Sequence, residues 1–162
     1  MPASYNITEQ DYVNGMRLHQ RGTRSVKVTY MILLASLAFL TVFGPERIRA
    51  MAIGGLVGGV AVMLLFQLLF MPMMARRHYR KYKAIQEPIT IELKDEGVEF
   101  TTTDSHSVFK WDKILKWRQN EHYILIYPMP QIFFLITKTI TNQSFDLAAL
   151  TDNLTTHVGK EG

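Results

Sequence analysis

Residues 28–75 read VTYMILLASLAFLTVFGPERIRAMAIGGLVGGVAVMLLFQLLFMPMMA, and their only charged side chains lie together in the middle of the stretch. Glu46, Arg47 and Arg49 separate two apolar runs, 28–45 and 50–75. A helix of about 20 apolar residues, rising about 1.5 Å per residue, crosses a hydrocarbon core of about 30 Å. Because the runs reach or approach this length, the sequence predicts a transmembrane hairpin with helices at about 26–44 and 50–74.

A cleaved signal peptide is the alternative for the first run, but a polar segment of about 25 residues precedes it, which is too long for a signal. We therefore expect both helices to be retained. The connection between them is short, so both termini lie on the same side of the bilayer. Lys and Arg flank the outer ends of the hairpin and are fewer between the helices, and such charges mark the cytoplasmic side. Both termini are therefore predicted to be cytoplasmic.

Positive charge is concentrated beside the hairpin, although the whole chain carries a formal net charge of +4. Residues 75–88 hold five basic groups and one acidic group, whereas residues 89–162 hold seven basic and ten acidic groups. The part after the hairpin is therefore mildly acidic, which disfavours a surface for nucleic acid. The chain has no cysteine, so it has neither disulfides nor a thiolate metal site.

The cytoplasmic segment before the hairpin, residues 1–25, is predicted to contain a short helix. Thr8 and Asp11 form a T-x-x-D start, in which the threonine side chain caps an amide of the first turn and the acid lies at the positive end of the helix. The helix should run from about residue 9 to 19. Its narrow apolar stripe can rest on a membrane surface or on another domain. The stripe consists of Tyr12, Val13 and Met16.

After residue 89 the apolar residues alternate with polar ones, a pattern typical of strands with one buried face. Turn sequences divide this region into about six strands, at 89–93, 98–102, 108–111, 114–119, 123–127 and 132–137. From about residue 144 the period becomes helical. The apolar face of that helix carries Leu147, Leu150, Leu154 and Val158. The sequence thus predicts an α+β membrane protein: a transmembrane α-hairpin, then a small antiparallel β-meander (89–162) closed by a C-terminal amphipathic helix.

Several segments are also found in a known family. They are residues 5–12 ahead of the hairpin, 96–98 (EGV), 109–114 (FKWDKI) and 136–138 (ITK). With the two-helix layout, these segments resemble the YcxB-like family of bacterial membrane proteins over nearly the whole chain. The resemblance implies a C-terminal domain similar to a pleckstrin-homology module and a location in the bacterial cytoplasmic (inner) membrane. It implies no defined biochemical role.

About six strands are one fewer than a full pleckstrin-homology barrel contains. Because both termini are expected on the same side of the membrane, residues 5–7 could add to the edge of the sheet. An added strand would satisfy backbone groups that are otherwise exposed at the edge. We treat this addition as a hypothesis.

The second predicted helix carries four glycines in two overlapping G-x-x-x-G patterns, at Gly54, Gly55, Gly58 and Gly59. Lipid tails solvate leucine as well as another helix does, so close helix contacts in a bilayer depend on small residues. The glycines therefore indicate a helix-packing face. Its occupant is either the first helix, through Ala35, Ser36 and Ala38, or a second copy of the chain.

The juxtamembrane linker, residues 76–88, begins with a group of basic residues that we call the basic collar. The collar consists of Arg76, Arg77, Arg80, Lys81 and Lys83. Positive charge on the cytoplasmic side of a helix orients the protein in the bilayer, and this role alone explains most of the group. The alternative is specific binding of anionic lipid headgroups, which gain about 1 kcal/mol for each charge near the surface.

Residues 123–135 contain more apolar side chains than a sheet with one buried face requires. Ile132, Phe133 and Phe134 stand out because they follow one another and so face both sides of a strand. Something must cover the second side. The candidates are the C-terminal helix, the membrane surface and a protein partner.

Motifs for catalysis, for a cofactor and for a metal are lacking in the sequence. The five histidines are scattered without helical metal-site spacing, and there is neither a nucleophile elbow nor a phosphate loop. We expect a non-enzymatic, multi-pass membrane protein that presents an interaction module, with a protein partner or another copy of itself. The alternative is an accessory or inhibitory subunit of a larger membrane complex, docked through the glycine face.

Overall fold

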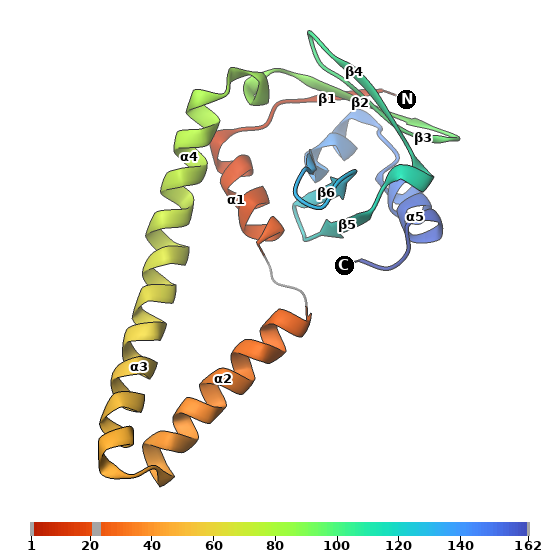
Figure 1. The fold of residues 1–162 in the computed structure, drawn as a ribbon. Coiled ribbons are helices and arrows are strands. Elements are labelled where there is room, and N and C mark those ends of the chain that lie inside the picture. Colours follow the sequence, from red (N-terminus) through yellow and green to blue (C-terminus); the bar gives the residue numbers. More distant parts are fainter. Residues whose placement is uncertain (1, 21–23, 162) are drawn as a thin grey trace. The chain divides into compact units, whose positions relative to one another are not determined.

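The structure is a computed structural model that describes residues 2–20 and 24–161 (Figure 1). The chain divides into two compact units. The first, which we call the β unit, consists of Met1–Gln20 and Ala75–Gly162, and the second, the helical unit, is Arg21–Met74. The protein is of the α+β class, and its sheets are antiparallel.

The helical unit is a pair of helices joined by a short turn. Helix α2 is Arg24–Phe43, and α3 is Glu46–Leu65. A π-helical turn, Phe66–Phe70, then leads directly into α4, Met71–Lys81. The π turn precedes Pro72, whose missing amide and ring disfavour the regular helical hydrogen bond to residue 68, so a wider turn accommodates the proline.

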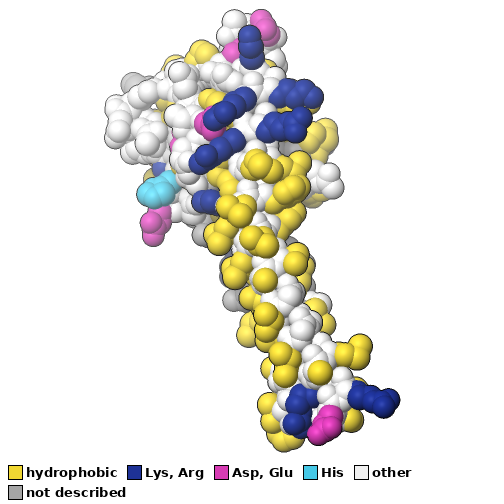
Figure 2. Space-filling model, turned by 90° about the vertical axis from the view of Figure 1, so that its left-hand side faces the viewer, with side chains coloured by type: hydrophobic (Ala, Val, Ile, Leu, Met, Phe, Trp, Pro, Cys, Tyr) yellow, Lys and Arg dark blue, Asp and Glu magenta, His cyan; other side chains and the backbone are white. Residues whose placement is uncertain are grey.

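The helical span Glu46–Lys81 contains 36 residues and is long and apolar enough to cross a membrane. In α2 the apolar part is shorter, Val28–Phe43. Hydrophobic side chains cover the helical unit on the face shown in Figure 2, and charged side chains gather at its tip. At this tip Arg49 donates hydrogen bonds to the Val42 and Gly44 carbonyls, at 3.2 and 3.3 Å, and so satisfies acceptors at the end of α2.

The β unit contains two antiparallel sheets. The first has the order β1-β2-β3-β4, and the second the order β5-β6-β7. The strands of the first sheet are β1 (Ala3–Tyr5), β2 (Ile89–Lys94), β3 (Gly97–Thr101) and β4 (His106–Lys110). Those of the second are β5 (Lys116–Gln119), β6 (Tyr123–Tyr127) and β7 (Phe134–Thr137). Two helices accompany them, α1 (Glu9–His19) and α5 (Leu147–His157).

The N-terminal segment supplies the seventh strand, as hypothesised from the sequence. Strand β1 pairs with β2 in the register Ala3↔Ile91, Ser4↔Thr90 and Tyr5↔Ile89. The paired residues start two positions earlier than predicted. Residues 1–20 and 75–88, which lie in the predicted N-terminal segment and at the juxtamembrane linker, belong to the same compact unit as the two sheets. Sheet pairing with β2 overrides the separation in sequence.

The core of the β unit lies between the sheets and under α5. Phe134 of β7 packs against Phe100 and Phe109 of the first sheet, with ring centroids 4.8 Å away in both cases. Leu150 and Leu154 of α5 are fully buried, as the helical pattern predicts. Trp111 and Trp117 are also buried, and each indole donates a hydrogen bond to a backbone carbonyl.

Candidate functional site: the attachment of α1

Helix α1 begins with the predicted cap. The Thr8 hydroxyl accepts a hydrogen bond from the Asp11 amide at 3.1 Å, and the Asp11 carboxylate accepts one from the Thr8 amide at 3.0 Å. The other carboxylate oxygen of Asp11 accepts a hydrogen bond from the Tyr123 hydroxyl at 2.7 Å. The capping residue therefore both starts α1 and attaches it to β6.

The middle of α1 lies close to the second sheet. Gly15 is buried, and a Cβ atom at this position would lie 3.0 Å from both terminal carbons of Leu135 on β7. Val13 and Leu18 are buried on either side of it. The predicted stripe of Tyr12, Val13 and Met16 is thus only partly correct, because the close approach at Gly15 rotates the buried face toward Leu18.

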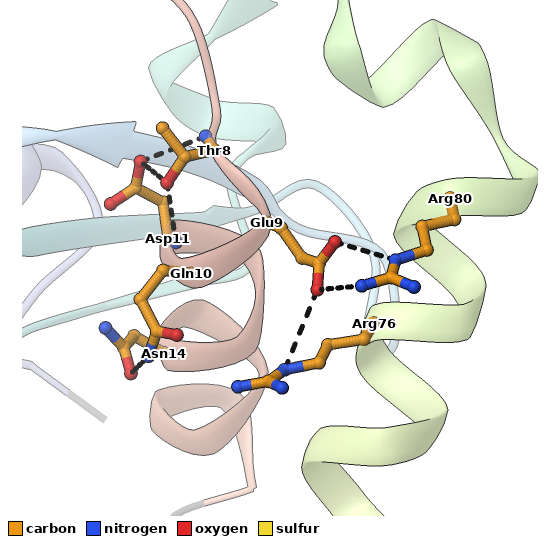
Figure 3. A network of polar contacts seen from close by, with 7 residues as sticks. All are labelled: Thr8, Glu9, Gln10, Asp11, Asn14, Arg76 and Arg80. Carbon is orange, nitrogen blue, oxygen red and sulfur yellow. Dashed lines mark hydrogen bonds and ion pairs between the residues drawn. The ribbon is translucent and has the colours of Figure 1, made fainter.

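At its N-terminal end, α1 contacts α4 through a carboxylate and two guanidinium groups (Figure 3). Arg80 donates two hydrogen bonds to Glu9, from Nε at 2.9 Å and from Nη2 at 3.1 Å. Arg76 Nε lies 3.7 Å from the same carboxylate. The hydrogen bond from Arg80 lowers the pKa of Glu9, and the nearby positive charges act in the same direction. The paired fork fixes orientation, although exposed ion pairs contribute little to stability.

Aromatic side chains extend the same contact. The Tyr79 hydroxyl donates a hydrogen bond to the Ile7 carbonyl at 2.8 Å, and the Tyr12 hydroxyl lies 2.9 Å from His78 Nδ1. The Tyr12 and His78 rings are stacked, with centroids 5.8 Å apart. Burial raises the pKa of Tyr12. The first residues of α4 in the β unit are therefore held by the N-terminal segment through both polar and apolar contacts.

The C-terminal end of α1 is held by a buried arginine. Arg118 of β5 is only 6% exposed, and its Nη1 donates a hydrogen bond to the His19 carbonyl at 2.9 Å. A positive charge is favourable there, because the carbonyls at the end of a helix carry partial negative charge. His19 also packs against Phe133, with ring centroids 4.9 Å apart, and its Nδ1 lies 3.1 Å from the Tyr127 hydroxyl. Burial lowers the pKa of His19, and Arg118 and Lys116 lower it further.

The comparison with known families concerns the part of the β unit that follows the α4 contact. Residues 93–150 match the family of YcxB-like proteins. The family resemblance predicted from the sequence is thus confirmed over this segment. No curated protein and no solved structure was found to match the chain.

The YcxB-like segment runs from β2 into α5 and includes Arg118, Tyr123 and Phe133, three of the residues that hold α1. Strand β1, α1 and the whole helical unit lie outside it. The segment therefore supplies one side of a contact whose other side comes from residues that precede the hairpin.

The basic collar is divided by the structure. Arg76 and Arg80 bind Glu9, whereas no ion pair among the described residues involves Arg77, Lys81 or Lys83. The Lys81 ammonium lies 5.7 Å from the centre of the Tyr82 ring. The five residues form one group in the sequence, because the partner of Arg76 and Arg80 is far away in the sequence.

The predicted helix-packing glycines do not form the contact between α2 and α3. Among the described residues, no atom outside the helix itself lies within 4 Å of a Cβ built on Gly54, Gly55, Gly58 or Gly59. Ala35, Ser36 and Ala38 are exposed as well. The two helices meet instead near buried Ala52, with Leu37, Thr41 and Leu56 half-buried. The described contact between α2 and α3 therefore does not run through these glycines, and the occupant of the helix-packing face stays a prediction.

The predicted partner surface of Ile132, Phe133 and Phe134 is mostly covered from within the β unit. Phe134 faces the first sheet, Phe133 packs on His19, and only Ile132 is exposed. The sequence correctly indicated that something covers the second side of this strand. The cover is α1 rather than a separate protein, because the N-terminal segment folds back onto the second sheet.

A feature that sequence analysis missed is the edge of β1. Gln143 accepts a hydrogen bond from the Ser4 amide at 2.8 Å and donates one to the Ser4 carbonyl at 2.7 Å, so its side-chain amide takes the place of a neighbouring strand. An open groove of about 540 Å³ lies beside it. The groove is lined by Ser4, Tyr5, Asn6, Pro88, Thr139, Ile140, Asn142 and Gln143.

Chemistry-bearing side chains are dispersed over the rest of the described chain. His106 lies 2.8 Å from Glu99, His157 stacks on Trp111, and His122 lies beside Tyr123. No group of three or more His, Asp or Glu among the described residues could hold a metal ion. The expectation of a non-enzymatic protein stays a prediction.

Proposed function

We propose that this protein is a non-enzymatic integral membrane protein that holds a pleckstrin-homology-like interaction module at the cytoplasmic face of the bacterial inner membrane. The observation that carries the proposal is the place of the hairpin in the chain. It leaves the β unit after Gln20 and returns at Ala75, so it is inserted between α1 and β2 of one folded unit. The module is thus tethered at two points instead of by one flexible linker.

The surface of the helical unit supports membrane insertion. Met31, Phe43 and Met51 are 70%, 70% and 77% exposed, amid many other exposed apolar side chains. Soluble proteins rarely expose apolar patches of this extent. The Ser36 and Thr41 hydroxyls donate to the Leu33 and Ala38 carbonyls of their own helix, at 2.8 and 2.7 Å, as groups in hydrocarbon must. Helix α2 has 20 residues and a length of about 30 Å, its apolar part is Val28–Phe43, and we propose it as the first membrane helix of the hairpin.

The strand arrangement supports the pleckstrin-homology-like module. A four-stranded and a three-stranded antiparallel sheet are followed by one C-terminal helix, and β1 provides the strand that the meander lacks. Such modules work by binding a partner rather than by catalysis. Arg77, Lys81 and Lys83 are the collar residues available for anionic lipid headgroups, and a protein partner or a second copy of the chain completes the proposal.

Cysteine accessibility tests the topology directly, because the chain contains no cysteine. Single substitutions Glu46→Cys, at the start of α3, and Thr103→Cys, between β3 and β4, would be treated with a membrane-impermeant maleimide on intact spheroplasts. We expect modification of residue 46 alone, and of both residues after lysis. Modification of residue 103 on intact cells, or recovery of the protein in the soluble fraction, would refute the proposed topology.

Purification of the tagged full-length protein in a mild detergent, followed by the mass of the intact complex, tests the interaction role. A stoichiometric protein partner or a defined homo-oligomer is expected. A monomer without associated protein would contradict that part of the proposal.

The second candidate function is that of an accessory subunit in a larger membrane complex. The open surface at the four glycines favours it, because small residues let another helix approach closely. Gly58→Leu should then release the protein from its complex without changing the thermal stability of the β unit. A matched substitution, Val60→Leu, enlarges a side chain that is exposed on the opposite side of the same helix and should have no effect.

A further inference from the structure

The β unit exposes three large apolar side chains at one end of its second sheet. Leu115, Met129 and Ile132 are 56%, 57% and 53% exposed. We call these three residues the loop edge. Leu115 lies directly before β5, and the other two lie in the connection between β6 and β7.

Strand register brings the loop edge together. The Leu115 amide donates to the Tyr127 carbonyl at 2.8 Å, and Lys116 is paired with Tyr127, the last residue of β6. Ile126 is paired with Phe134, the first residue of β7. The start of β5, the end of β6 and the start of β7 therefore coincide, and the three exposed side chains belong to one end of the sheet.

The C-terminal end of α1 lies at this same end. His19 contacts both Tyr127 and Phe133, which flank the connection that carries Met129 and Ile132. Arg118 of β5 donates to the His19 carbonyl. The loop edge is thus fixed beside the last turn of α1.

Chain length limits how far α1 can lie from the start of α2. Gln20 directly follows α1, and α2 begins at Arg24, so four Cα–Cα steps separate them and cover at most about 15 Å. The apolar part of α2 begins one helical turn later, at Val28. The headgroup region is itself several ångströms thick, about 5–8 Å on each side of the hydrocarbon core. The limit of about 15 Å between Gln20 and Arg24 follows from the number of residues between them alone.

The charge beside the loop edge suits a membrane surface. Lys113 and Lys116 flank Leu115, and the acid in this segment, Asp112, is paired with Lys113 at 3.3 Å. The Lys116 ammonium lies 4.9 Å from the centre of the Tyr127 ring. Exposed apolar side chains with neighbouring lysines are typical of segments that enter the headgroup layer.

We propose that the loop edge is a second membrane contact, in which Leu115, Met129 and Ile132 enter the headgroup layer of the cytoplasmic leaflet. This inference rests on the proposed membrane anchoring. It assigns an occupant, a lipid surface, to a patch that the β unit leaves exposed. Two tethers and one interfacial contact together fix which side of the module faces the cytoplasm.

Depth-dependent quenching tests the contact on the full-length chain. Met129→Cys and Ile132→Cys would each carry an environment-sensitive fluorophore, in liposomes of phosphatidylcholine and phosphatidylglycerol with or without brominated lipid. Val108→Cys is the matched control, because Val108 is 47% exposed on β4 of the other sheet. Leu64→Cys on α3 reports insertion of the hairpin. Circular dichroism verifies the fold of each variant.

We expect brominated lipid to quench labels 129 and 132 at least about twofold more than label 108, as for side chains at the headgroup boundary. The loop-edge contact would be overturned if label 64 were strongly quenched while labels 129 and 132 were quenched no more than label 108. The membrane anchoring would then remain intact. Lack of quenching at 64 would refute the anchoring itself, and the loop-edge contact with it.

Discussion

The two ends of α1 are attached to the β unit by different kinds of charge. At the N-terminal end, Glu9 binds two arginines whose side chains are more than half exposed, so water and salt screen the attraction. At the C-terminal end, the guanidinium of Arg118 is buried and binds helix carbonyls. The exposed end therefore sets orientation, whereas the buried end carries stability, because a lost partner in a dry site is not replaced by water.

The largest effect is expected at the buried end. Arg118→Ala leaves carbonyls of α1 without their donor and opens a cavity, so it should destabilise the β unit by about 2–4 kcal/mol. Thermal unfolding in detergent, followed by the fluorescence of Trp111 and Trp117, measures the loss. Lys113→Ala, a change at an exposed cation of the same segment, is the control. An equal effect of both changes would show that the buried arginine does not carry the stability of this end.

The middle of α1 should give the next largest effect. Gly15→Val places a branched side chain where even a Cβ lies 3.0 Å from Leu135, and overpacking of this kind costs about 1–3 kcal/mol. Thermal unfolding followed by tryptophan fluorescence measures this loss as well. The double change Gly15→Val with Leu135→Ala should recover part of the loss, since it removes the atoms that clash. If the double variant recovered nothing, the close approach would not be the cause.

A hydrogen bond near the start of the segment should contribute less. The buried Tyr5 hydroxyl donates to the Leu135 carbonyl at 2.9 Å, and burial raises the pKa of Tyr5. Tyr5→Phe removes the donor and keeps the ring, so the free energy of unfolding should fall by about 1 kcal/mol. Tyr30→Phe, on the exposed surface of α2, should leave it unchanged. A larger loss at Tyr30 would reverse the expected order.

The smallest effect belongs to the exposed end. Glu9→Gln removes the charge that binds Arg80, and the change in stability should be smaller than for Tyr5→Phe and should shrink further in high salt. Since the pKa of Glu9 is lowered in the folded state, its contribution is present above the ordinary carboxyl pKa and is lost as the pH falls through the lowered value. The difference between wild type and Glu9→Gln should therefore vanish in acid. If the difference in stability between wild type and Glu9→Gln persisted at low pH and in high salt, the exposed end would contribute to stability after all.

Local patterns predicted the individual elements well. Thr8 and Asp11 marked the start of α1, alternation marked β2 to β7, and the period of Leu150 and Leu154 marked α5. These signals depend on neighbouring residues only. The apolar excess around Phe133 also showed that the strand is covered on both sides, although it could not name the cover.

Contacts between distant residues could not be predicted in this way. Strand β1 has only three residues, too few for a pattern, and its edge is completed by Gln143, which is 139 residues from Ser4. The four glycines gave a strong pattern for helix packing, yet the structure brings none of α2 to them. Small residues permit close approach but do not specify which helix approaches.

The sequence by itself determined the apolar hairpin, the basic residues beside it, the strands and the two amphipathic helices, because hydrophobic length and period are properties of contiguous residues. Tertiary structure alone decided that residues 1–20 complete the β unit, that Glu9 takes two arginines from the basic collar, and that Arg118 holds the end of α1, 99 residues away. No local sequence pattern links the residues that form these pairs. They form because a buried donor, acceptor or apolar face needs a partner, and only the folded chain determines which one is within reach.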